Sequence, residues 1–280
     1  MRRSVRWDPG AGRADTLAFV FSRLSRLSRP RALAVCAVPI LALFAVAAFA
    51  PLPFTLAQPG TTANVLGVDK GRQIITISGA PVHKASGELL MTTILATSPS
   101  ADIGLADVVE GWFRTDRAVL PRDSVYPAGK SDAEIEKRNL GQMKQSQDSA
   151  VLAALDYVGE DSDGVDVRLH LADVGGPSAG LLFSLGVVDK LEAGDLTGGR
   201  VVAGTGTISP DGRVGAVGGV SLKTQAAARD GATVFLVPKA ECGDAESELP
   251  AGLRLIPVTT LTDAVSSLRA LDGGGKVPSC

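Results

Sequence analysis

The feature that most constrains this chain is a stretch without any charged residue, from Ala32 to Val68. Its first part, residues 32–54, is almost wholly apolar and long enough to cross a membrane as a helix. Residues 1–31 hold eight arginines against two aspartates. The positive-inside rule then predicts a cytoplasmic basic tail at 1–31, a transmembrane helix at 32–54, and the remainder of the chain outside the cytoplasm.

A cleaved signal peptide is the alternative interpretation of this region. Ala48-Phe49-Ala50 has the small-x-small pattern of a cleavage site. The apolar run is longer than the core of a signal peptide, and the leader before it is long, so a retained single-pass anchor in the cell membrane is favoured. Residues 55–64 are interpreted as a polar linker, and the folded domain is expected over 65–280.

The rest of the chain mixes helix and strand patterns without strict alternation, which predicts an α+β fold. Apolar alternation and turn residues predict strands at 72–78, 88–97, 165–171, 200–209, 213–217, 233–237 and 253–258. Helix patterns with their caps occupy 105–114, 131–157, 177–191, 222–229 and 260–271.

Composition and motif spacing argue against several classes of function. A net charge of -2 gives no electrostatic reason to expect nucleic acid as a partner. No cluster has metal-ligand spacing, so we expect no metal and no other cofactor. The phosphate-binding pattern GxxxxGK[ST] does not occur, so ATP is not expected as an energy source.

Three cysteines are spaced far apart along the chain. Cys36 lies in the apolar run and is interpreted as a small apolar residue. Cys242 and Cys280 fall on the proposed outer side of the membrane, where disulfides persist. They are candidates for a disulfide, with two free thiols as the alternative.

The segment with the strongest chemical signal is Gly176-Pro177-Ser178-Ala179-Gly180. Proline is favoured at the first position of a helix, so Pro177 is predicted to begin one, with Ser178 in its first turn. The first N–H groups of a helix lack internal partners. The backbone N–H groups of Ser178 and Ala179 are therefore candidates for an oxyanion hole beside a nucleophilic hydroxyl.

The same five residues also fit G-x-S-x-G, the nucleophile pattern of α/β-hydrolases. That family needs a histidine after the serine, whereas His83 and His170 both precede Ser178. The hydrolase triad is excluded, but a histidine-before-serine order, as in chymotrypsin or subtilisin, stays open. His170 lies in an alternating strand pattern that is more typical of a packed or edge residue.

A lysine is the other side chain that can serve as the general base for a serine. Such a lysine must be desolvated so that its amine is largely neutral. Lys223 has Ala226 and Ala227 at positions i+3 and i+4, which puts it on the small apolar face of a helix. A surface lysine extending past alanines is the alternative.

Three motifs in the same order resemble the proteolytic domain of Lon proteases: Gly176-Pro177-Ser178-Ala179-Gly180, Thr205-Gly206-Thr207-Ile208 and Gly218-Gly219-Val220-Ser221-Leu222-Lys223. The strand pattern at 231–238 also resembles the family. The likeness extends from about Leu66 to the end of the chain, including both outer cysteines. It is greatest to membrane-anchored, ATPase-free Lon-like proteases of bacteria.

This resemblance implies that Ser178 is the nucleophile, Lys223 the general base, and Thr205 the residue that orients the lysine amine. It also implies a homo-oligomer such as a hexameric ring. An aspartate often precedes the Gly-Pro-Ser of the family, but Gly176 stands there and Asp173 is farther away. We therefore assign no role to an acid.

Relatives of this type usually carry a peptide-binding PDZ domain before the serine strand. Here residues 157–165 leave no room for one, so substrate capture is left open. The sequence predicts an ATP-independent serine endopeptidase with a Ser-Lys dyad, acting on unfolded extracytoplasmic polypeptides. A catalytically idle membrane-tethered scaffold and a signal-peptidase-like processing enzyme are the alternatives.

Overall fold

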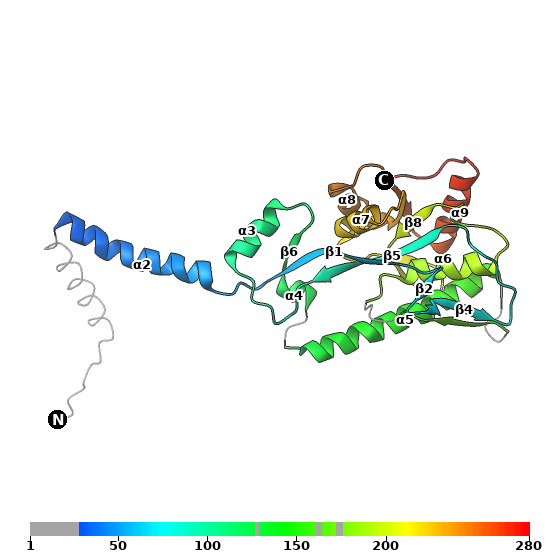
Figure 1. Ribbon diagram of the computed structural model, residues 1–280, viewed down its shortest axis with the longest axis horizontal. Coiled ribbons are helices and arrows are strands. Elements are labelled where there is room, and N and C mark those ends of the chain that lie inside the picture. The colour runs from blue at the N-terminus through cyan, green and yellow to red at the C-terminus, as the bar shows by residue number, and fades with distance from the viewer. Residues whose placement is uncertain (1–27, 127–128, 161–163, 172–175) are drawn as a thin grey trace, which may run out of the picture. The chain divides into compact units, whose positions relative to one another are not determined.

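The computed structural model describes residues 28–126, 129–160, 164–171 and 176–280 (Figure 1). The chain divides into two compact units, Met1–Leu52 with Gly104–Ala106, and Pro53–Ile103 with Asp107–Cys280. Asp173 and the predicted basic tail, apart from its last four residues, lie outside the described residues.

The first unit contains helix α2 (Arg29–Phe49), and apolar side chains such as Leu33 and Phe44 are exposed on it. The helix ends at Phe49 because Ala50 is extended, the conformation that a following proline favours. The predicted membrane segment 32–54 is therefore helical only to Phe49. Within the described part of the chain, no helix combines the length and apolar character that crossing a membrane requires.

The second unit begins earlier than predicted, because the expected linker at 55–64 is a strand. Strand β1 (Phe54–Asn64) pairs antiparallel with β5 (Glu88–Ala96) on one side and with β6 (Ala118–Pro121) on the other. It thus lies inside the main sheet, and the interpretation of 55–64 as a linker was wrong. The folded unit starts at residue 53 rather than 65.

A bulge explains why this strand does not look like one in the sequence. The pairing with β5 shifts register between Pro59 and Thr62, so the Pro59-Gly60 pair is absorbed without ending the strand. A Cβ on Gly60 would lie 2.8 Å from the backbone carbonyl carbon of Thr93, so only glycine fits there. The polar composition of residues 58–64 misled the prediction, while Thr55 and Ala57 in the first half of the strand are buried.

The main sheet has six strands in the order β12-β11-β8-β5-β1-β6. Four neighbouring strands run parallel: β5, β8 (Val201–Gly204), β11 (Val234–Pro238) and β12 (Arg254–Val258). The antiparallel strands β1 and β6 complete it. A mixed sheet with helices agrees with the predicted combination of helices and strands.

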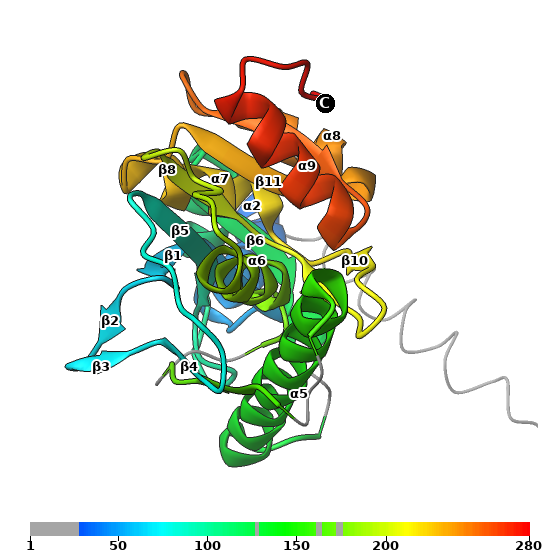
Figure 2. The same cartoon turned by 90° about the vertical axis from the view of Figure 1, so that its right-hand side faces the viewer.

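Helices cover both faces of this sheet (Figures 1 and 2). One core contains residues of α5 (Asp132–Val158), α6 (Gly180–Leu191) and α9 (Leu261–Asp272). The other contains residues of α7 (Val220–Arg229) and α8 (Cys242–Ser247). Strand β11 shows the two faces directly, since Val234 and Leu236 join the first core and Phe235 and Val237 the second. Burial on both faces explains its uninterrupted apolar sequence.

Shorter elements complete the described structure: β2 (Val68–Asp69), β3 (Arg72–Gln73), β4 (Ile75–Ser78), α3 (Leu105–Phe113), α4 (Arg122–Val125), β7 (Asp166–Leu169), β9 (Thr207–Ile208), β10 (Val214–Gly215) and η1 (Lys239–Glu241). The capping boxes predicted at Ser131 and Thr260 are confirmed. The strands predicted as single units at 72–78 and 200–209 are each divided in two.

Candidate active site

Ser178 lies in a half-buried turn just before helix α6. The helix begins at Gly180, with Ala179 as its N-cap, so the prediction that Pro177 starts it was three residues early. Gly176 opens the turn at a φ of 94°, in the left-handed region that favours glycine. Its N–H donates to the carbonyl of Asn139 on α5 at 3.1 Å, which ties the turn to that helix.

The turn is also held from α5 and β9 by close packing. Ser146 on α5 donates its hydroxyl to the Pro177 carbonyl at 2.9 Å. A Cβ on Gly180 would lie 2.8 Å from the Ser146 hydroxyl and 2.8 Å from a methyl group of Ile208. The position of the serine is therefore fixed by neighbouring elements as well as by its own helix.

Lys223 lies on α7 with only 3% of its surface exposed. Ala226 and Ala227 on the same helix are 0% exposed, so the prediction that this lysine occupies the buried face is confirmed. Its Nζ donates a hydrogen bond of 3.1 Å to the hydroxyl of Thr205.

Thr205 connects the lysine to the serine turn. Its hydroxyl donates to the main-chain carbonyl of Ser178 at 3.3 Å, and the N–H of Gly206 donates to the same carbonyl at 2.9 Å. Because its proton points to the carbonyl, Thr205 can only accept from Lys223. Thr205 and Gly206 form the break between β8 and β9, which the predicted continuous strand did not anticipate.

Among the hydrogen bonds of the described residues, none joins the Lys223 amine directly to the Ser178 hydroxyl. The two side chains are linked through Thr205 instead. Catalytic hydrogen bonds are often long without substrate and tighten when it binds. The structure thus links Ser178, Thr205 and Lys223, which come from the turn before α6, the β8–β9 break and α7.

Burial lowers the pKa of Lys223 to about 8, while the nearby carboxylates of Glu241 and Asp244 act in the opposite direction. With this pKa, roughly one tenth of the amines are neutral at pH 7. Both acids come from the segment after β11. No local sequence pattern indicates their proximity to Lys223, because only the fold places them beside α7. They are the residues that the prediction missed.

The backbone N–H groups of Ser178 and Ala179 lie next to the serine hydroxyl along the chain. In the described part of the chain, no hydrogen bond uses the N–H of Ser178 or of Ala179. Both precede the first turn of α6, where the helix dipole favours negative charge. A developing oxyanion at this position would meet unpaired donors.

The histidines do not join this group of residues. The hydrogen bonds described for His83 and His170 use their backbone N–H groups, which donate to Lys190 and Ile74. His170 lines a separate cavity of about 430 Å³ together with Asp69 and Arg72. The arrangement provides no support for a histidine base.

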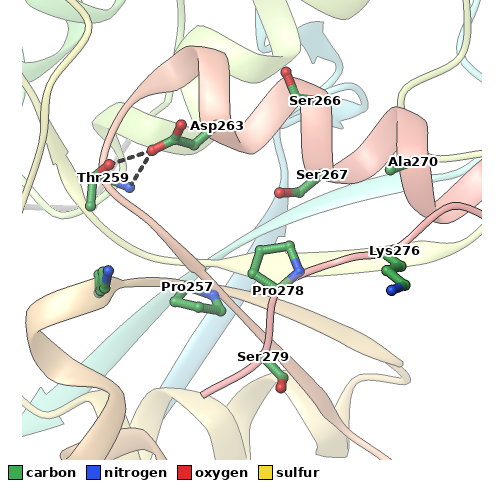
Figure 3. Close-up of a pocket in the computed structure, with 10 residues that line it drawn as sticks. Pro257, Thr259, Asp263, Ser266, Ser267, Ala270, Lys276, Pro278 and Ser279 are labelled. Atoms are coloured by element: carbon green, nitrogen blue, oxygen red, sulfur yellow. Dashed lines mark hydrogen bonds between the residues drawn. The ribbon is translucent and has the colours of Figure 1, made fainter.

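Two other cavities differ in their relation to Ser178. One of about 230 Å³ adjoins the serine turn at Pro177 and is lined by uncharged side chains that include Gln142, Ser149 and Thr207. A larger one of about 530 Å³ lies by α9 and the C-terminal segment, and neither Ser178 nor Lys223 lines it (Figure 3). Neither Ser178 nor Lys223 lines the smaller cavity, which reaches the serine turn at Pro177.

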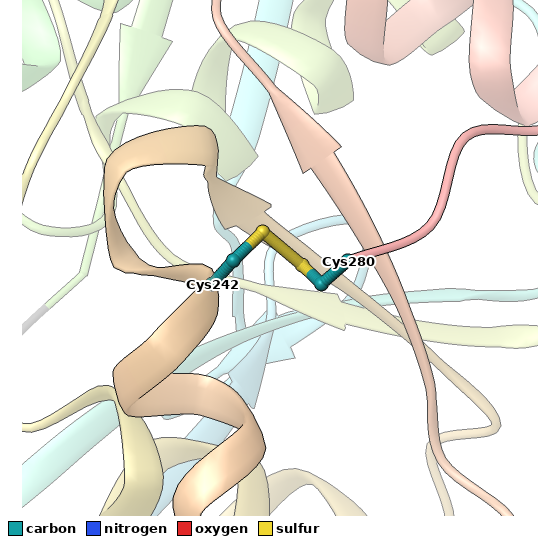
Figure 4. Close-up of a disulfide and its surroundings, with 2 residues drawn as sticks. All are labelled: Cys242 and Cys280. Atoms are coloured by element: carbon teal, nitrogen blue, oxygen red, sulfur yellow. A yellow bond between two sulfur atoms is a disulfide. The ribbon is translucent and has the colours of Figure 1, made fainter.

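Cys242 at the start of α8 is joined to Cys280 by a disulfide (Figure 4). The bond attaches the C-terminal segment to α8. Because Glu241 directly precedes Cys242, the linkage also borders the acidic residues that act on Lys223.

A buried lysine is therefore linked, through the hydroxyl of Thr205, to the main chain of a serine that lies just before a helix. Residues 140–269 match the model of the Lon protease (S16) C-terminal proteolytic domain. This match covers Ser178, Thr205 and Lys223. This part of the chain is therefore similar to the proteolytic domain of Lon proteases, and the similarity classes the chain as a serine peptidase.

Whole Lon proteases show the same similarity. The chain is 26% identical to the Lon protease of Neorickettsia sennetsu over 72% of its own length and 25% of that protein. It is 26% identical to the Lon protease of Xanthomonas oryzae over 74% of its length and 26% of that protein. With the Lon protease of Clostridioides difficile it shares 39% identity over 32% of its length and 11% of that protein. The chain spans about a quarter of the length of the first two relatives.

Proposed function

We propose that this protein is an ATP-independent serine endopeptidase with Ser178 as nucleophile and Lys223 as general base. The Ser178 hydroxyl attacks a peptide carbonyl while the neutral amine of Lys223 takes its proton. The lysine then gives that proton to the leaving amine, and an acyl-enzyme remains. Water activated by the same lysine hydrolyses the acyl-enzyme and releases the serine.

Two further roles belong to this proposal. The hydroxyl of Thr205 accepts one N–H of the lysine, which leaves the nitrogen lone pair free to face the serine. The N–H groups of Ser178 and Ala179 stabilise the oxyanion of the tetrahedral intermediate. The observation that carries the proposal is the buried amine of Lys223, linked through Thr205 to the backbone of Ser178.

The test is cleavage of an unfolded protein by the purified full chain and by its Ser178→Ala and Lys223→Ala variants. We expect both variants to lose activity while their circular dichroism stays unchanged. Ser266→Ala on α9 and Lys144→Ala on α5 are matched controls, since both side chains are exposed. Activity that survives in Ser178→Ala would refute the proposal, and an inactive wild type would favour the idle scaffold.

We propose unfolded or flexible polypeptides as substrates, captured directly at the cavity beside Pro177 without a PDZ domain. Its uncharged polar lining suits an extended chain whose amides need hydrogen-bond partners. Proteolysis of a folded protein and of its denatured form, compared without ATP, tests this substrate class. Equal rates on both forms would contradict it.

We also propose that the domain acts outside the cytoplasm and that the N-terminal segment attaches it to the cell membrane. A disulfide persists in an oxidising compartment. Eight arginines lie in residues 1–31, at and before the start of helix α2. Leu33 and Phe44 of this helix are 72% and 69% exposed to solvent, which favours cover by lipid. Recovery of the protein in the soluble fraction after cell lysis would contradict the attachment.

A homo-oligomer, such as a hexamer, completes the proposal and is supported by the likeness to Lon proteases. Light scattering of the detergent-solubilised protein gives its mass directly. A monomer at working concentration would remove this part of the proposal and leave the dyad untouched.

A further inference from the structure

Glu241 places a partly used carboxylate beside the helix that carries Lys223. It is the last residue of η1 and is half-buried. Its Oε1 accepts a hydrogen bond of 2.9 Å from the N–H of Val217, just before α7. Its Oε2 is buried and, among the described residues, has no hydrogen-bond partner. One oxygen thus accepts a backbone hydrogen bond, while the other has no hydrogen-bond partner among the described residues.

Asp244 is the second acid near the lysine, but its carboxylate is occupied by backbone hydrogen bonds. It accepts hydrogen bonds from the N–H groups of Val220 and Ser221 at 2.9 and 3.4 Å, and so caps the start of α7. Glu241 and Asp244 are the charged groups that favour the protonated form of Lys223, and the effect of Glu241 is the larger of the two. Helix α7 also packs against the strands β1, β5, β8 and β11. The side chain beside β8 that hydrogen-bonds the amine is the neutral Thr205.

We propose that Glu241 is the acidic positioning residue of this site and stabilises the ammonium that Lys223 becomes during catalysis. This inference rests on the proposed Ser178–Lys223 dyad. When the proton passes from the Ser178 oxygen to the Lys223 nitrogen, a positive charge forms in a site that water hardly reaches. A carboxylate fixed nearby offsets that cost without exchanging a proton itself, as the acid of a catalytic triad does.

The variant Glu241→Gln tests this, because its amide oxygen can still accept from Val217 while the charge is lost. We expect two effects that oppose each other. The acid limb of the pH profile of kcat/KM moves down by about one unit, since the lysine loses a charge that favours its protonation. The maximal kcat falls by about tenfold, since the ammonium loses its counter-charge.

Glu246→Gln on α8 is the matched control, because it removes the same charge from an exposed position on the adjacent helix. It should change neither quantity. A fall in kcat with an unmoved pH profile would show that Glu241 has only a structural role, and it would overturn the proposal. Unchanged values of both quantities would overturn it as well.

A second measurement is independent of activity. NMR of ¹³C-labelled lysine gives the pKa of Lys223 in the Ser178→Ala background, with and without Glu241→Gln. We expect a lower pKa in the double variant, and an equal or higher pKa would overturn the proposal. Failure of the dyad itself would appear differently, as wild-type-like activity in Ser178→Ala. If Glu241→Gln fails to fold, Glu241→Asp, with a retracted carboxylate, should lower the lysine pKa by a smaller amount, and an unchanged pKa there would count against the role.

Discussion

Single residues decide the chemistry here, and the amine of Lys223 is the clearest case. It is neutral to a useful extent because burial outweighs the two carboxylates that favour its charge. Removing either carboxylate should therefore change the pKa of Lys223 by a measurable amount. A lysine in water, with its ordinary pKa near 10.4, would be roughly 200-fold less available as a base at pH 7.

The first prediction at this scale concerns pH. Lys223 must be neutral to accept a proton, and its pKa is about 8. We expect kcat/KM to rise with pH below this value and to level off above it, with a midpoint near pH 8. Initial rates on one peptide between pH 6 and 10 check this. A midpoint near 6.5 would instead point to a histidine.

Thr205→Val provides a second test at the residue scale. Valine keeps the shape but cannot accept from the lysine or donate to the Ser178 carbonyl, and it leaves that buried amine without a partner. We expect kcat to fall by about 10- to 100-fold, in line with the loss of a group that orients the base. Thr205→Ser restores the hydroxyl and should recover most of the rate. Equal losses in both variants would argue against a role for the hydroxyl.

At the scale of elements, the first turn of α6 fits closely against β9 and α5. Gly180→Ala would place a methyl group 2.8 Å from both Ile208 and Ser146. We expect a loss of about 1–3 kcal/mol in the free energy of unfolding, with reduced activity because Ser178 is displaced.

A matched substitution separates packing from the intrinsic preference of glycine. Gly141 lies inside α5 with nothing near its absent side chain, so Gly141→Ala should raise stability by about 0.5–1 kcal/mol. Urea unfolding of both variants gives the comparison. Effects of the same sign would contradict the close fit described for Gly180.

The elements also show how far local sequence patterns reach. Both capping boxes and the buried face of α7 were predictable, because each depends on residues within one turn of helix. Strand β1 was not, because a bulge hides its continuity and its burial depends on β5 and β6. Ser178 and Lys223 could be proposed from local patterns, and Thr205 from the resemblance to a family. Glu241 could not, because it lies in η1 after β11, which no local pattern connects with α7.

Considered as a whole, the folded unit is closed at its C-terminal end by the disulfide between Cys242 and Cys280. The bond encloses a loop with a sequence separation of 38 residues. Reducing it should lower the free energy of unfolding by up to about 4 kcal/mol in the chain-entropy model. Urea unfolding with and without a thiol reductant measures this, in a Cys36→Ser background that leaves no third thiol. An unchanged midpoint would contradict a stabilising bond.

Helix α6 is buried at every position from Gly180 to Asp189, so none of these residues faces solvent. Most helices tolerate replacement along one stripe, and their mutational profiles repeat every three to four residues. A saturation scan of this chain should therefore show an unbroken block of intolerance directly after Ser178. Few substitutions in the helix that follows Ser178 would then be neutral. Changes in substrate preference would instead be expected in α5 and β9, which line the cavity beside Pro177.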